Sequence, residues 1–114
     1  MRISYPQNII ALATGKGTCF FTPGEIVRLE ASSNYTNIFF RDRTQLLSAK
    51  VLKEFVKLLE PFGFIRTHRS HLVNRQHILY VDLHGNVVMQ DHSMAEVSRR
   101  KKSDVMKELK TIAA

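Results

Sequence analysis

Apolar residues in this chain occur mostly in short runs of four to six residues, and turn-forming residues separate the runs. Gly, Pro, Asn and Ser occupy most of the breaks, which is typical of β-strands joined by tight turns. The predicted strands cover residues 9–12, 18–21, 26–31, 35–40, 44–47, 64–68, 78–83, 87–90 and 94–97. The tripeptide His84-Gly85-Asn86 between two of these runs predicts a hairpin turn. The pattern therefore predicts a mostly β fold.

One segment inside the chain departs from the strand pattern and predicts a helix. Its apolar residues fall at i, i+1, i+4, i+7 and i+8, which places them on one face of a helix. These residues are Val51, Leu52, Phe55, Leu58 and Leu59. Ser48 is the expected N-cap, and Pro61 with Gly63 is expected to end the helix.

A second helix is predicted at the C-terminal end, over residues 98–112. Its apolar face consists of Val105, Met106, Leu109 and Ile112. Its first turn carries the cations of residues 99–102, although the positive end of a helix dipole disfavours cations by roughly a few tenths of a kcal/mol each. Local rules are usually broken at functional sites, so we expect an anion to bind at this helix start.

The composition fits one globular domain over residues 1–114, large enough to bury a core without disulfides or metal. The formal net charge of +7 favours an anionic partner. The single Cys19 excludes an internal disulfide and is expected to be a small buried hydrophobe. The chain has no apolar run long enough to span a membrane and no signal peptide, so we expect no membrane association and a cytoplasmic location.

Acidic residues are missing from three polar windows, at residues 31–41, 61–81 and 97–103. In the second window three arginines alternate with three histidines, and no carboxylate offsets their charge. An anionic partner is the simplest reason to tolerate such a segment, and nucleic acid is the most common large one. If the windows lie on one edge of the fold, arginine would be available for guanine or phosphate, and Asn, Ser and Thr for base edges.

Catalysis and metal binding have little support in the sequence. His68 and His71 have an H-x-x-H spacing, but no second His or Cys pair stands at a matching distance. There is no phosphate-binding glycine loop, no nucleophile elbow and no obvious carboxylate pair. We therefore expect no enzyme activity, no cofactor and no metal. The open alternatives are a basic β-rich interaction or sensory module that binds an acidic partner, and RNA binding, which would require more exposed aromatic residues.

Three segments, in order, resemble the LytTR DNA-binding domain family of bacterial transcriptional regulators. Residues 64–74, FIRTHRSHLVN, resemble the family's central F-x-R-x-H-R-S-x-[LV]-V-N signature. Residues 26–35, IVRLEASSNY, and residues 97–100, VSRR, resemble two further family segments. The resemblance extends over about residues 9–109.

The resemblance implies about ten strands in small antiparallel sheets, with one internal helix and a C-terminal helix. It also implies the effector domain of a two-component response regulator. Loops on one side of the sheets would enter successive major grooves of double-stranded DNA at direct repeats in a promoter, with a second protomer bound beside the first. Family members commonly carry an upstream receiver domain, which we expect to be absent from this chain.

The resemblance also assigns roles to individual residues. The expected base-contacting residues are Thr36 or its neighbour Asn37, Arg69 and Arg99. The residues expected to contact phosphates or to position the loops are Arg66, Ser98, Arg100 and Lys102. His68 and Asn74 are expected to structure the loops. Some members carry Asn at the position of Arg69, and an arginine there favours guanine over adenine.

Overall fold

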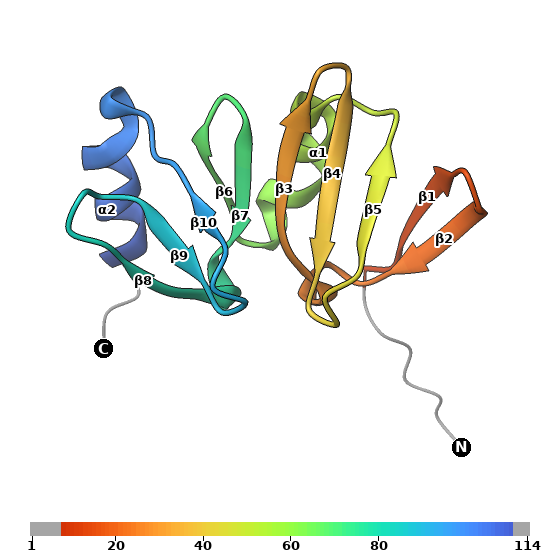
Figure 1. Ribbon diagram of the computed structural model, residues 1–114, viewed down its shortest axis with the longest axis horizontal. Helices are drawn as coiled ribbons and strands as arrows, with labels where there is room; N and C mark the ends of the chain where they lie inside the picture. The colour runs from red at the N-terminus through yellow and green to blue at the C-terminus, as the bar shows by residue number, and fades with distance from the viewer. Residues whose placement is uncertain (1–7, 111–114) are drawn as a thin grey trace.

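The computed structural model describes residues 8–110, and strands dominate it (Figure 1). The strands are β1 Ile10–Thr14, β2 Gly17–Phe21, β3 Ile26–Ser32, β4 Tyr35–Phe40, β5 Gln45–Ser48, β6 Phe64–His68, β7 His71–Asn74, β8 Ile78–Val81, β9 Val87–Met89 and β10 Met94–Ala95. The helices are α1 Leu52–Leu59 and α2 Lys102–Lys110, and the 3-10 turns are η1 Pro23–Glu25, η2 Glu60–Phe62, η3 Arg75–His77 and η4 Arg99–Lys101. The predicted mostly β fold with an internal and a C-terminal helix is confirmed.

The strands of the described residues form three antiparallel sheets. The central sheet has the order β5-β4-β3-β7-β6, and β1 and β2 form a separate hairpin beside it. The third sheet has the order β10-β9-β8. Figure 1 shows the central sheet between the β1–β2 hairpin on one side and the third sheet with α2 on the other.

Two hydrophobic cores hold these layers together. One lies where α1 covers the central sheet, and Phe55 and Leu59 of the helix pack there with Leu29, Ile38 and Leu72 of the sheet. The second core joins the central sheet to the third sheet and to α2. Its buried residues are Val27, Ile65, Val73, Val87, Met89, Ala95, Val97 and Val105.

The sequence pattern missed β7 and misplaced the start of α1. Strand β7 is four residues long and follows β6 after a turn at Arg69 and Ser70. Its apolar stretch is only Leu72 and Val73, which is too short to predict a strand. The N-cap of α1 is Val51 and not Ser48, which is a correction. Ser48 is buried at the end of β5, and its hydroxyl accepts a hydrogen bond from the backbone N–H of Lys50 at 3.1 Å.

The C-terminal helix is shorter than the predicted span of residues 98–112. The chain first forms the 3-10 turn η4, and α2 begins at Lys102 and carries Asp104 in its first turn, where an acid suits the helix dipole. Val105 is buried on the predicted apolar face. Ile112, the last residue of that face, lies outside the described residues.

The turn between β8 and β9 forms at His84-Gly85-Asn86, as predicted. Asp82 N–H donates to the carbonyl of Asn86 at 2.8 Å, and Gly85 has a φ of 84°, which favours glycine. A Cβ at Gly85 would lie 3.1 Å from Cδ of Lys102, so this turn packs closely against the start of α2.

Candidate nucleic-acid interface

The three acid-free windows meet at one edge of the fold. In Figure 1 the β3–β4 turn, the β6–β7 turn and the start of α2 all lie along the upper edge. Two backbone hydrogen bonds join the windows: Ala31 N–H donates to Ser70 O at 2.9 Å, and Ser98 N–H donates to Thr67 O at 2.8 Å. Residues that are far apart in the sequence therefore form one continuous surface, which we call the recognition edge.

Internal hydrogen bonds shape the β6–β7 turn. The guanidinium of Arg66 donates to the carbonyl of Arg69 at 2.6 Å and to the carbonyl of His68 at 3.3 Å. Nδ1 of His68 accepts a hydrogen bond from the backbone N–H of Ser70 at 3.0 Å. The side chain of Arg69 is exposed. Arg66 and His68 thus hold the turn, and Arg69 is presented to the outside.

The four cations at the start of α2 divide into two pairs. Nζ of Lys101 lies 3.5 Å from the carbonyl of Arg66, and Nζ of Lys102 donates to the carbonyl of His84. Burial lowers the pKa of Lys101, and the charges of Arg66 and Arg100 lower it further. Arg99 and Arg100 are exposed, and within residues 8–110 neither guanidinium donates a hydrogen bond. The lysines attach the helix start to two hairpins, and the arginines face solvent.

A small cavity of about 260 Å³ lies between the β6–β7 turn and the start of α2. It is lined by Arg66, His68, Arg69, Ser98, Arg100 and Lys101. The hydroxyl oxygen of Ser98 is buried and has no hydrogen-bond partner among the described residues. A buried hydroxyl without a partner is costly, and here it lies among four cationic side chains. The chemistry of this cavity suits an anion that carries oxygen acceptors.

The structure separates Thr36 from Asn37. Thr36 is fully buried, and its hydroxyl donates to the carbonyl of Lys50 at 2.7 Å. Its side chain is therefore enclosed within the fold, and the base-reading role expected for it stays a prediction that Asn37 fits better. Asn37 is half-buried in β4, one residue further from the β3–β4 turn.

Asn74 lies below the recognition edge, at the end of β7. It is 1% exposed, and its amide donates to the carbonyls of Ile26 at 2.9 Å and Pro23 at 3.3 Å. Its side-chain oxygen accepts a hydrogen bond from the backbone N–H of Gln76 at 3.0 Å, which caps η3. Its contacts join β3, β7 and η3.

A partly buried charge cluster beneath the recognition edge had no signal in the sequence pattern. The Glu30 carboxylate lies 3.1 Å from Nη1 of Arg28 and 3.6 Å from Nδ1 of His71. Arg28 is buried, and its guanidinium carbon lies 4.1 Å from the centre of the Phe39 ring. Its Nε donates to the hydroxyl of Ser93 at 2.8 Å. Arg28 and Glu30 stand on alternate positions of β3, whereas Phe39, His71 and Ser93 come from β4, β7 and the turn before β10, so only the fold brings them together.

The His71 side chain makes stability depend on pH. Burial lowers its pKa below the usual 6.5, Glu30 opposes this shift, and Arg28 and His68 add to it. His71 has a pKa of about 6.5 in the unfolded state and a lower pKa in the folded state, so between these values the unfolded state binds more protons. The free energy of unfolding therefore falls as the pH decreases below about 6.5. Urea unfolding at several values between about pH 7.5 and 5.5 should show this loss, and His71→Asn should flatten it. If the free energy of unfolding depended on pH equally in the variant and in the unmodified chain, His71 would not be the cause. Carboxylates with a lowered pKa, such as Asp91, titrate at lower pH and do not account for a change in this range.

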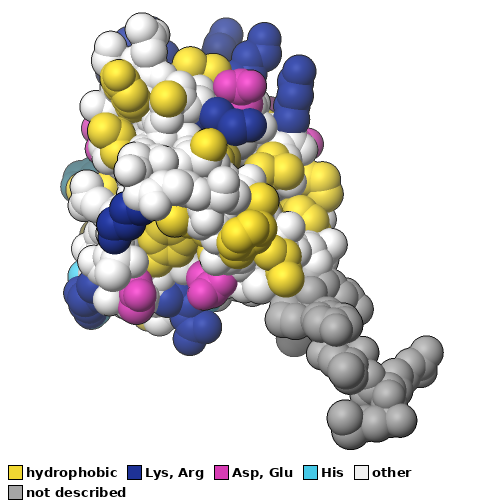
Figure 2. Space-filling view, turned by 90° about the vertical axis from the view of Figure 1, so that its right-hand side faces the viewer, with side chains coloured by type: hydrophobic (Ala, Val, Ile, Leu, Met, Phe, Trp, Pro, Cys, Tyr) yellow, Lys and Arg dark blue, Asp and Glu magenta, His cyan; other side chains and the backbone are white. Residues whose placement is uncertain are grey.

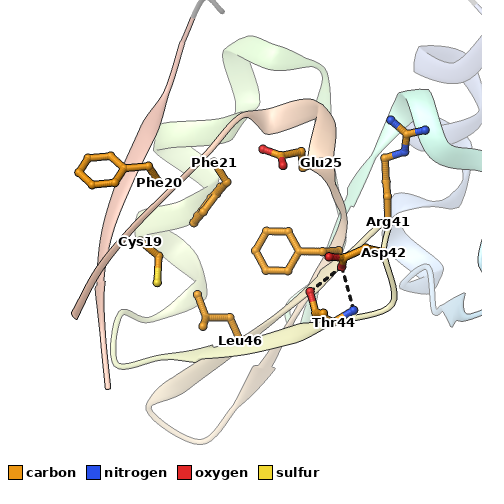
Figure 3. A pocket seen from close by; sticks show the side chains of 9 residues that line it. Cys19, Phe20, Phe21, Glu25, Arg41, Asp42, Thr44 and Leu46 are labelled. Atoms are coloured by element: carbon orange, nitrogen blue, oxygen red, sulfur yellow. Dashed lines mark hydrogen bonds between the residues drawn. The ribbon is translucent and has the colours of Figure 1, made fainter. Parts of the chain in front are cut away.

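A second cavity, of about 500 Å³, lies away from the recognition edge (Figure 3). It is lined by Cys19, Phe20, Phe21, Glu25, Phe40, Arg41, Asp42, Thr44 and Leu46. Figure 2 shows apolar side chains gathered on this side of the molecule, with charges of both signs around them. Cys19 is half-buried there, with Sγ 3.4 Å from the hydroxyl oxygen of Thr14. This cavity is mainly apolar, in contrast to the cationic edge.

None of the helices within residues 8–110 is long and apolar enough to cross a membrane.

Comparison with known proteins places the chain in a family. The family model described as the LytTR DNA-binding domain matches residues 16–110. A solved structure with a similar fold is the LytTR DNA-binding domain of a Bacillus cereus protein described as a methyl-accepting/DNA response regulator. The two are 29% identical with a TM-score of 0.75, and the match covers 91% of this chain and 98% of that one. The comparison with curated proteins found no match. The family match confirms the resemblance seen in the sequence, and the chain belongs to the LytTR DNA-binding domain family.

Proposed function

We propose that this chain is a sequence-specific double-stranded DNA-binding domain that regulates transcription. The observation that carries the proposal is the recognition edge, where three acid-free windows meet and exposed guanidinium groups face solvent. Membership of a DNA-binding domain family supports it, as does the formal net charge of +7. LytTR is a DNA-binding family and not an enzyme family, so this function involves no catalytic step.

Base recognition in this proposal rests on Arg69, Arg99 and Asn37. Arg69 and Arg99 are exposed at two neighbouring turns, and an arginine reaches guanine O6 and N7 with two hydrogen bonds. Asn37, whose backbone lies in β4, supplies an amide suited to adenine. A major groove of B-DNA is about 12 Å wide, so a protruding turn can enter it.

Phosphate binding in this proposal rests on the cavity beside the β6–β7 turn. The Ser98 hydroxyl has no partner among the described residues and can donate to a phosphate oxygen. Arg100 supplies charge from the exposed side, and Lys101 supplies it from the partly buried side. Lys102 contributes less to phosphate binding, because its ammonium already donates a hydrogen bond to the carbonyl of His84. Its main part is to join the β8–β9 turn to α2.

We further propose that the chain acts as the effector domain of a response regulator and binds promoter direct repeats, with a second protomer on the same DNA. The similarity to a domain described as part of a response regulator supports the first part. Two copies on a direct repeat face the same way along the DNA, so any contact between them would be head to tail.

Selection from a randomised duplex library at fixed physiological salt, followed by sequencing, tests the proposal. We expect enrichment of one short motif, and a repeat of that motif if two protomers bind together. Salt-sensitive binding without any enriched motif would contradict sequence-specific recognition. That result would favour the alternative, a basic module for an acidic protein partner. Tighter binding to single-stranded RNA than to duplex DNA of equal length would also contradict it.

Replacing Arg100 by alanine should weaken binding to all duplex sequences by a similar factor. If the guanidinium neutralises one phosphate, the slope of log K against log salt concentration should become about 0.9 less steep. Binding measured by fluorescence anisotropy across a salt series gives this slope. Lys57→Ala is the matched control, because it removes the same charge from the last turn of α1. An unchanged slope for Arg100→Ala would remove this residue from the phosphate contacts.

A further inference from the structure

A row of polar side chains crosses the central sheet beneath the recognition edge. Asn37 of β4 is paired with Glu30 of β3, Glu30 with His71 of β7, and His71 with His68 of β6. Directly paired residues of antiparallel strands point to the same face of the sheet. One end of the row is Asn37, and the other end is the residue before Arg69. The row thus connects two of the proposed base-reading positions.

Contacts are continuous from the centre of this row to the β6–β7 turn. The Glu30 carboxylate lies 3.6 Å from Nδ1 of His71, and the rings of His71 and His68 are 5.5 Å apart. His68 in turn accepts the hydrogen bond from Ser70 N–H, and Ser70 O accepts one from Ala31 N–H. The turn is therefore attached to β3 both by its backbone and through this set of side chains.

Glu30 is the acid that the cations of this region share. The groups that face His71 are Glu30 and Arg28 from β3, His68 from β6, and Glu96 after β10. The Arg28 guanidinium is fixed at 3.1 Å from Glu30 and at 2.8 Å from Ser93. Without the Glu30 carboxylate, the buried Arg28 charge would lose its nearest anion and would repel any positive charge on the histidines. Nδ1 of His71 is buried without a hydrogen-bond partner among the described residues, and it would lose the carboxylate that lies 3.6 Å away.

We propose that Glu30 and His71 are positioning residues, which set the β6–β7 turn so that Arg69 meets its base. This inference rests on the proposed function. Neither residue is assigned a contact with DNA. The His71 side chain is 12% exposed, and the Glu30 carboxylate, although its side chain is 38% exposed, is paired with Arg28 and would repel a phosphate. Replacing either residue should therefore change the preference for one DNA sequence over another. It should not change the affinity for the phosphate backbone, which depends on other charges of the recognition edge.

Glu30→Gln tests the inference, with Glu54→Gln as its matched control. Both changes raise the formal net charge by one unit, and Glu54 lies in the first turn of α1. Glu30→Gln should lower the preference for the selected motif over random duplex by about tenfold, the discrimination expected from one base contact. Its affinity for random duplex should equal that of Glu54→Gln. An equal loss on both duplexes, or no loss of preference, would overturn the positioning role.

A second measurement requires no DNA and decides the inference if the chain has no preferred sequence. Amide proton exchange and chemical shifts of Ser70 and Ala31, followed by NMR, report the two hydrogen bonds of the turn. Both amides should exchange faster in Glu30→Gln and in His71→Asn than in Glu54→Gln, while amides of α1 stay unchanged. Unchanged amides of the turn would overturn the inference. Absence of a preferred motif for the unmodified chain would overturn the proposed function alone.

Discussion

An Asn74→Ala variant is expected to lose about 3 kcal/mol of unfolding free energy, because several buried polar groups lose their partners together. The carbonyls of Ile26 and Pro23 and the backbone N–H of Gln76 all use the Asn74 amide. Asn74 is 1% exposed, so water cannot replace these hydrogen bonds in the folded state. Urea unfolding followed by circular dichroism measures the change.

Asn34→Ala is the control for this substitution, because Asn34 is exposed in the β3–β4 turn. It should change the free energy of unfolding by less than about 0.5 kcal/mol. Equal stability of the two variants would show that the three backbone groups do not depend on Asn74. That result would contradict its role in joining β3, β7 and η3.

An Arg99→Ala variant is expected to lose about 1–3 kcal/mol of binding free energy on the selected motif and to lose preference at one base pair. Arg99 is exposed at the start of η4, so truncation leaves both cores intact and removes only the group that would reach guanine. Repeating the duplex selection with the variant identifies the base pair whose preference is lost.

Arg99→Lys separates charge from hydrogen-bond geometry at this position. Lysine keeps the positive charge but lacks the planar pair of donors that matches guanine. It should retain most of the affinity for random duplex and still lose discrimination at that base pair. A uniform loss of affinity for all sequences in Arg99→Ala would assign Arg99 to phosphate contact instead.

Much of this fold could be predicted because its elements have strong local patterns. The hairpin turn around Gly85 and the amphipathic helix around Phe55 depend on residues close together in sequence. The start of α1 was misplaced because the Ser48 hydroxyl caps its own turn instead of the helix. Strand β7 was missed because its place in the sheet depends on pairing with β3, which is distant in sequence.

The candidate site was predictable in composition but not in arrangement. The absence of acids marked the three windows, but only the sheet order and the hydrogen bond from Ser98 N–H to Thr67 O show that they meet. Thr36 and Asn37 are neighbours in sequence with opposite environments, and the strand pairing decides which of them is buried. The partners of Lys101 and Lys102 are carbonyl oxygens in other hairpins, so no pattern of side chains could reveal them.

The separation between the recognition edge and the two cores has a consequence for how such a domain diverges. Arg69, Arg99 and Arg100 are exposed and contribute little to packing, whereas the cores lie on the faces of the central sheet. Under the proposed function, substitutions at Arg69 and Arg99 would change the preferred operator, and substitutions at Arg100 would change the overall affinity, at almost no cost in folding. If the proposed base contacts hold, duplicated copies of this gene would acquire new target sites through a few exposed residues, while the interior remains the same.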